Sequence, residues 1–199
     1  KPHRAVLMAA KVPADSRLYG DALDVLVRAL QKEGSSSDQQ RAREVMEVYL
    51  KHFPSGEHAR QMHLKLAKWL LARESFEEAA DHLWKLRRTY PLAGEADEAA
   101  SLLEKHRADF PEEVRAEIDQ PPTDVLLARF RSLYDDHRSR TLIDQLSEPL
   151  DDWTPGSRKR CRGLYWMGRS HTKLRDHAEA ASWYDRVLEE CSGIPPFEK

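Results

Sequence analysis

Glycine, β-branched runs and long apolar stretches are scarce in this chain, and each scarcity excludes a class of structure. Only 8 of its 199 residues are glycine, and no run rich in valine, isoleucine or threonine occurs, so we do not expect a β-sheet. No apolar run approaches the roughly 18 residues that a membrane-spanning helix needs. The sequence therefore favours an all-α fold with no membrane span.

An excess of positive charge is also missing. The 32 Lys and Arg residues are balanced by 34 Asp and Glu residues, which gives a net charge of -2, so we expect no nucleic-acid partner. Charged residues make up 33% of the chain, and the mean hydropathy is -0.73. These values are polar for a compact globule but ordinary for a solenoid of amphipathic helices, which has a high surface-to-volume ratio.

Cysteine is limited to Cys161 and Cys191. The first lies near the start of an expected helix and the second at the end of its antiparallel partner. A helical hairpin brings these ends together, within the roughly 7 Å between Cα atoms that a disulfide needs. An oxidised pair would indicate an exported protein, whereas two buried thiols would not, and the sequence leaves both alternatives open.

Histidine is more frequent but scattered. No pair of the 9 histidines has a metal-binding spacing with a third ligand nearby. We therefore expect no metal and no cofactor.

Residues 162–191 match the signature of a tetratricopeptide repeat, a helix–turn–helix unit in which two small residues let the helices cross closely. Gly168 and Ala180 take the two small positions. The large and aromatic positions are taken by Leu164, Met167, His171 and Tyr184, and His171 departs from the pattern.

The rest of the chain contains less regular versions of this helix–turn–helix unit. Residues 66–86 repeat it, with Ala67 and Ala79 at the small positions, and aromatic–proline pairs end helices at Phe53-Pro54, Tyr90-Pro91 and Phe110-Pro111. The spacing of the repeats is irregular. We predict a right-handed α-solenoid of helix–turn–helix, tetratricopeptide-like repeats.

Further helix starts and one boundary can be placed from local signals. We expect helices to begin with caps near Asp15 or Ser16, at Asp38 and at Thr123. Gln120-Pro121-Pro122 is a stiff break, so we predict N-terminal repeats over 1–119 and C-terminal repeats over 120–199. The 158–191 unit belongs to the second group, and the two groups are expected to form one continuous superhelix.

A basic stripe is the main candidate for binding. Seven Lys and Arg residues and no acidic residue lie between Ser157 and Arg175. Four of these cations span only about 60° of a helix: Arg158, Arg162, Arg169 and Lys173. Tyr165 lies beside the stripe, and guanidinium groups with an aromatic face suit carboxylates and sugars. We therefore name Arg162, Tyr165, Arg169 and Lys173 as candidate groove residues. The alternative is a solvated face balanced by acids of neighbouring repeats.

The sequence also resembles a known family. The run Leu164-Tyr165-Trp166-Met167-Gly168-Arg169, the run Lys173-Leu174-Arg175-Asp176-His177-Ala178-Glu179-Ala180 and the terminal Cys191 resemble the superhelical N-terminal region of soluble lytic murein transglycosylases. Phe53-Pro54-Ser55-Gly56-Glu57-His58-Ala59 and Tyr90-Pro91 look like the same region. The resemblance covers most of the chain loosely and about 35 residues well. Periplasmic tetratricopeptide adaptors are equally similar.

The resemblance implies a superhelix that carries a lysozyme-like catalytic domain, which uses one Glu to cleave peptidoglycan into 1,6-anhydro ends. That domain would lie beyond Lys199. Glu74-Ser75-Phe76 imitates the first half of the catalytic motif, but it is expected at a turn between repeat helices, and no Gly-Leu-Met-Gln-like segment follows. We expect no catalytic residue in this chain, which opens on Lys1 and is interpreted as a processed or excised piece.

Two functions are therefore carried forward. The first is the non-catalytic superhelical scaffold of a periplasmic lytic transglycosylase, which binds peptidoglycan and its own downstream catalytic domain. The second is a protein–protein adaptor of the bacterial cell envelope, whose concave groove binds an extended peptide or a C-terminal carboxylate.

Overall fold

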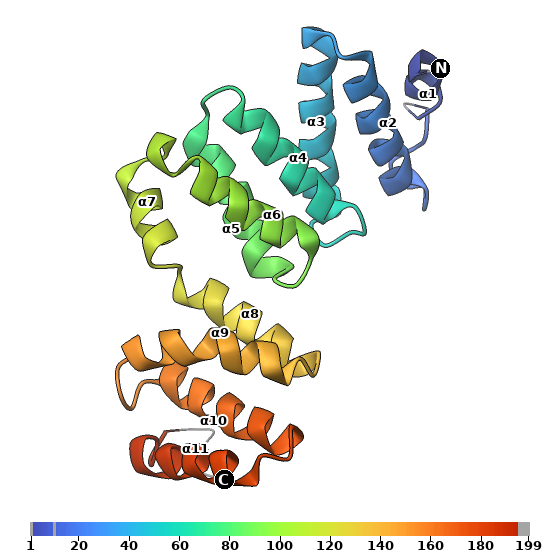
Figure 1. The fold of residues 1–199 in the computed structure, drawn as a ribbon. Helices are drawn as coiled ribbons and strands as arrows, with labels where there is room; N and C mark the ends of the chain where they lie inside the picture. The colour runs from blue at the N-terminus through green and yellow to red at the C-terminus, as the bar shows by residue number, and fades with distance from the viewer. Residues whose placement is uncertain (1, 10, 195–199) are drawn as a thin grey trace. The chain divides into compact units, whose positions relative to one another are not determined.

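The computed structural model describes residues 2–9 and 11–194, and within these ranges the chain is helical and contains no strand. This confirms the all-α class (Figure 1). The first helices are α1 (Pro2–Ala9), α2 (Tyr19–Glu33), α3 (Ser36–His52), α4 (Ala59–Leu71), α5 (Phe76–Thr89), α6 (Gly94–Lys105) and α7 (Glu112–Asp119). They are followed by α8 (Thr123–Asp135), α9 (Ser139–Asp152), α10 (Arg158–Lys173) and α11 (His177–Glu190).

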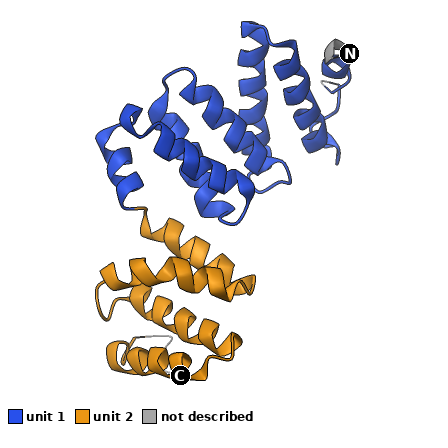
Figure 2. Cartoon of the chain, viewed as in Figure 1, with its two compact units in different colours: residues 1–120 blue, residues 121–199 orange. Residues whose placement is uncertain are grey.

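The chain divides into two compact units, residues 1–120 and 121–199 (Figure 2). The division falls beside the two consecutive prolines, Pro121 and Pro122. A residue that precedes proline is driven out of the helical region, and Gln120 has φ -128° and ψ 86°, so α7 ends at Asp119. The local sequence thus explains why helix does not continue from one unit into the next.

Within each unit, helices that follow one another in sequence pack in pairs. In the first unit α2 packs on α3 and α4 on α5, and α6 then lies against both α5 and α4. In the second unit α8 packs on α9 and α10 on α11, while α10 also contacts α9 and α8. In each unit, therefore, one helix packs against both helices of the hairpin before it: α6 against α4–α5, and α10 against α8–α9.

Three of the hairpins share one turn. Glu74, His137 and Arg175 have φ values of 59°, 58° and 63°, and each is two residues before the helix that follows. The residue after each of them donates its backbone N–H to a carbonyl five positions earlier: Ser75 to Leu70, Arg138 to Leu133 and Asp176 to His171. The common turn therefore allows the residues of α4–α5, α8–α9 and α10–α11 to be aligned position by position.

The register fixes which residues cross between helices. Ala67, Phe130 and Gly168 are equivalent on the first helix of each hairpin, because each lies three residues before the carbonyl that closes the turn. A Cβ on Gly168 would lie only 2.7 Å from Cε1 of Tyr184. The close helix crossing expected at Gly168 is therefore present, whereas Phe130 occupies that position between α8 and α9.

The aromatic–proline stops agree with the structure. Helix α3 ends at His52 and α5 ends at Thr89. Phe53 and Tyr90 are their C-caps, and the N–H of each donates to a carbonyl four residues earlier. Phe110 likewise follows a short 3-10 helix, Arg107–Asp109.

The three expected helix starts are wrong by one to four residues. Helix α2 begins at Tyr19, because the Ser16 hydroxyl accepts from the Leu18 N–H in a turn instead of capping a helix. Helix α3 is capped by Ser35, and Asp38 lies inside it, where its backbone N–H donates to the Ser35 hydroxyl and its carboxylate accepts from that hydroxyl. Helix α8 starts with Thr123 as its first residue, not its cap, since the Pro122 carbonyl accepts the first helical bonds.

Candidate binding face on helix α10

The four candidate groove residues lie on one exposed side of α10. Arg162, Tyr165, Arg169 and Lys173 are all exposed, and 36% of Tyr165 is accessible to solvent. The opposite side of the helix is the core side, where Leu164 and Met167 are buried. Here we call the exposed residues Arg162, Tyr165, Arg169 and Lys173 the α10 face.

Tyr134, at the end of α8, organises the C-terminal half of the α10 face. The Arg169 Nε–H donates to the Tyr134 hydroxyl at 3.4 Å, and the Lys173 ammonium donates to the Tyr134 carbonyl at 3.2 Å. The same ammonium lies 4.1 Å from the centre of the Tyr134 ring. The ring also stacks on Trp166, with centroids 6.3 Å apart. Two cations are thus held against one aromatic platform.

The charges of this face are not neutralised by neighbouring acids. In the described part of the chain, no carboxylate lies within 4.0 Å of the charged groups of Arg162, Arg169 or Lys173. The partners of Lys173 are the Tyr134 carbonyl and ring and the His137 Nδ1 at 3.0 Å. The hydrogen bond to Tyr134 raises the pKa of Arg169, so its guanidinium keeps its charge. The arrangement can accept an anion without first breaking an ion pair.

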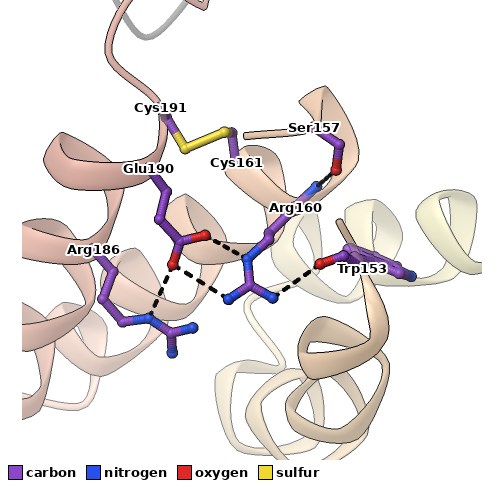
Figure 3. Close-up of a disulfide and its surroundings, with 7 residues drawn as sticks. All are labelled: Trp153, Ser157, Arg160, Cys161, Arg186, Glu190 and Cys191. Atoms are coloured by element: carbon purple, nitrogen blue, oxygen red, sulfur yellow. Dashed lines mark hydrogen bonds and ion pairs between the residues drawn. A yellow bond between two sulfur atoms is a disulfide. The ribbon is translucent and has the colours of Figure 1, made fainter. Parts of the chain in front are cut away.

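A disulfide fixes the other end of the same helix (Figure 3). Cys161 near the start of α10 is bonded to Cys191 just after α11, with Cα atoms 5.7 Å apart. Both cysteines are buried. The bond ties together the two ends of the α10–α11 hairpin that the shared turn does not connect.

Arg160 adds a second connection beside the disulfide (Figure 3). Its Nε–H and Nη2–H groups donate to the two carboxylate oxygens of Glu190, and its Nη1–H group donates to the carbonyls of Leu150 and Trp153. This bond pattern raises the pKa of Arg160 and lowers the pKa of Glu190. Only 7% of Arg160 is exposed, so this cation is structural and does not belong to the α10 face.

The Glu74-Ser75-Phe76 segment lies at the turn between α4 and α5, as expected. A hollow of about 500 Å³ is open to solvent there, and the carboxylates of Glu74, Glu77, Glu78 and Asp109 line it. Phe76 packs edge-on against Phe110 at 6.0 Å. The backbone of Glu74 is the shared left-handed turn position, so its conformation is explained by the hairpin alone.

One side-chain pair was not anticipated from sequence. His63 of α4 and His82 of α5 place their Nδ1 atoms 2.8 Å apart in a hydrogen bond. Burial, then the neighbouring charges of His82 and Lys85, lowers the pKa of His63 to about 4, and burial also lowers the pKa of His82. Among the described residues, no group of three or more His, Cys, Asp or Glu side chains is arranged to hold a metal ion.

Comparison with known proteins finds no matching family model, no matching curated protein and no matching solved structure. The resemblance to lytic transglycosylases therefore depends on the quoted residues alone. Across residues 2–9 and 11–194, none of the helices combines the length and the apolar character that crossing a membrane requires.

Proposed function

We propose that this chain is a non-catalytic scaffold, a solenoid of tetratricopeptide-like repeats whose α10 face binds peptidoglycan. The observation that carries the proposal is the unneutralised charge of Arg162, Arg169 and Lys173 beside the exposed ring of Tyr165. Guanidinium groups pair with the carboxylates of peptide stems, and aromatic faces pack on sugar rings. Both kinds of group occur in the cell-wall polymer.

The repeat architecture supports the scaffold part of the proposal. Three hairpins share a turn in which a left-handed residue precedes the next helix by two positions. In addition, α8 contacts α10, so the first helices of these two successive hairpins lie next to each other, and α4 likewise contacts α6. Solenoids arrange such helices into an extended binding surface.

The disulfide supports the proposed compartment. A buried Cys161–Cys191 bond is a feature of proteins that fold in an oxidising environment such as the periplasm. Together with the sequence resemblance, it leads us to place the chain in the cell envelope, attached to a lytic transglycosylase domain that would supply the catalysis.

Sedimentation with insoluble peptidoglycan tests the binding part. The purified chain should sediment with the polymer at low salt, and the triple variant Arg162→Glu, Arg169→Glu, Lys173→Glu should remain in the supernatant. A matched triple variant, Arg41→Glu, Lys51→Glu, Arg140→Glu, carries the same change of net charge at exposed positions elsewhere, and it should bind like the wild type. Equal sedimentation of all three proteins, with unchanged helical circular dichroism, would remove the α10 face from the mechanism.

A protein partner is the second candidate. Tyrosine and arginine are enriched in protein interfaces, and both are exposed on the α10 face. A pull-down from an envelope extract should then recover one protein through the wild-type chain and not through the charge-reversed variant, with no polymer required.

A further inference from the structure

The first unit contains a pocket built around Trp69 that the proposed function does not use. It has a volume of about 300 Å³ and lies between the α2–α3 hairpin and the second half of α4. Ala42 and Met46 of α3 form its buried base, and the ring of Trp69 forms a wall. Lys65 of α4 and Arg73, which is in the turn after α4, also line it. We call this the Trp69 pocket.

The guanidinium of Arg73 is held by stacking on a ring and not by an ion pair with a carboxylate of the described chain. Its guanidinium carbon lies 3.8 Å from the centre of the Trp69 ring. Its described polar partner is the Gln39 side-chain oxygen, at the long distance of 3.5 Å, and no carboxylate of the described chain pairs with it. A guanidinium that stacks on an indole keeps its N–H edges available for a carboxylate. Because stacking already restricts the side chain, less entropy is lost on binding.

Lys65 adds a second positive charge to the lining of the pocket. It is eight residues before Arg73 in the sequence. Burial lowers the pKa of Lys65, although nearby Asp24 acts in the opposite direction. Asp24 is itself engaged with Arg28 at 2.6 Å. The third lining cation, Lys68, is bound to Glu98 at 2.6 Å. Arg43, whose guanidinium carbon is 5.2 Å from the centre of the Trp69 ring, is bound to Glu47 at 2.8 Å. Arg73 and Lys65 are therefore the cations that a ligand can engage without breaking an ion pair.

We propose that the Trp69 pocket binds an organic carboxylate, with its charged group on Arg73 and its hydrocarbon or aromatic body against Trp69 and Met46. The size of the pocket is at the lower end of the range for small-ligand sites, and it accommodates one bulky amino-acid side chain. A compact inorganic anion would leave the apolar base without a contact. The ligand is therefore an acid with an apolar body, either a free small molecule or the end of a peptide chain.

The test uses the whole chain labelled with ¹⁵N and follows the indole N–H signal of Trp69. This nitrogen is buried and has no hydrogen-bond partner among the described groups, so its signal is sensitive to changes nearby. Replacement of Trp69 by Phe identifies the signal among those of the 5 tryptophans. N-acetylphenylalanine is the probe, and N-acetylphenylalaninamide is its neutral control with the same shape.

The acid should shift the Trp69 signal along a saturable curve, whereas the amide should bind at least about tenfold more weakly. Arg73→Gln should weaken binding of the acid by a similar factor, and Arg73→Lys should have an intermediate effect because it keeps the charge without the fork. Arg41→Gln, an identical change at an exposed position of α3 outside the pocket, should leave binding unchanged.

Two further arms distinguish the sources of the acid. A peptide that ends in phenylalanine should bind more tightly than acetylphenylalanine if a chain end is the natural ligand, and no more tightly if a small molecule is. The proposal is overturned if the Trp69 signal does not move, if the amide binds as well as the acid, or if Arg73→Gln binds like wild type while keeping a native spectrum. None of these results depends on the α10 face, which lies in the other unit.

Discussion

The replacement of Gly168 by alanine is the most direct perturbation of the α10–α11 hairpin. Gly168 lies in the middle of α10 against the ring of Tyr184 from α11. A Cβ at this position would lie 2.7, 2.9 and 3.1 Å from Cε1, Cδ1 and Cζ of that ring. The Tyr184 hydroxyl is within 3.2 Å of the Thr172 hydroxyl, which in turn donates to the Gly168 carbonyl at 2.8 Å. The ring is therefore held in place and cannot easily yield.

Two opposing terms set the magnitude of the effect. Overpacking a fitted contact destabilises a protein by about 1–3 kcal/mol. Replacing a glycine inside a helix by alanine stabilises the helix by about 1 kcal/mol. With the overpacking the larger of the two, we expect Gly168→Ala to lower the stability of the hairpin by up to about 2 kcal/mol. In a Tyr184→Ala background the clash is absent, so the same change should be neutral or stabilising.

Native-state hydrogen exchange of the α10 and α11 amides measures this free energy locally, which is required because the chain forms two compact units. Gly94→Ala, at the first residue of α6, is the control, since no atom lies within 4 Å of the added Cβ. If Gly168→Ala were as harmless as Gly94→Ala, or if its effect persisted in the Tyr184→Ala background, the inferred helix crossing would be refuted.

Three other perturbations have expected outcomes. Replacing Cys161 and Cys191 by alanine should lower the free energy of unfolding by about 3–4 kcal/mol for a separation of 30 residues, as measured in urea, and reductant should then have no further effect. Arg160→Leu should lower the free energy of unfolding by about 2 kcal/mol, because the Glu190 carboxylate then keeps only its ion pair with Arg186. Replacing Glu190 by leucine as well should restore part of this loss. Because the pKa of His63 falls from 6.5 to about 4 on folding, the unfolded chain binds the proton more readily between these values. Protonation of His63 in the unfolded chain should therefore lower the free energy of unfolding by about 2–3 kcal/mol as the pH falls from 6.5 to 4, and urea unfolding of His63→Asn across this range should lack that decrease.

The hairpins could be predicted from sequence because their signals are local. Gly168 and Ala180 belong to one helix–turn–helix unit, and together they mark the place where its two helices cross closely. Phe53 and Tyr90 mark helix ends because a proline follows each of them. The predicted helix starts were less accurate, because several neighbouring residues near Ser16 and near Asp38 have side chains that can cap a helix. Which one caps the helix depends on the turn that precedes it, as the two hydrogen bonds between Ser35 and Asp38 show.

Contacts between hairpins could not be predicted in the same way. Trp69 and Arg73 are four residues apart at the end of α4 and in the turn after it, so their contact is local, but the base of their pocket comes from α3. Tyr134 reaches the α10 face from a different hairpin, 35 residues before Arg169. His63 and His82 are separated by 19 residues, so a search for local metal-binding spacings does not detect them.

Arginine side-chain signals test the central claim most directly, because they report where the chain is contacted. The ¹⁵N-labelled chain would be titrated with soluble peptidoglycan fragments while the Nε–H signals of Arg162 and Arg169 are followed, with buried Arg160 as an internal reference. The account predicts that the Arg162 and Arg169 signals shift together and saturate, while Arg160 stays fixed. Saturable binding that moves other signals but leaves Arg162 and Arg169 unchanged, or no binding at all, would contradict it.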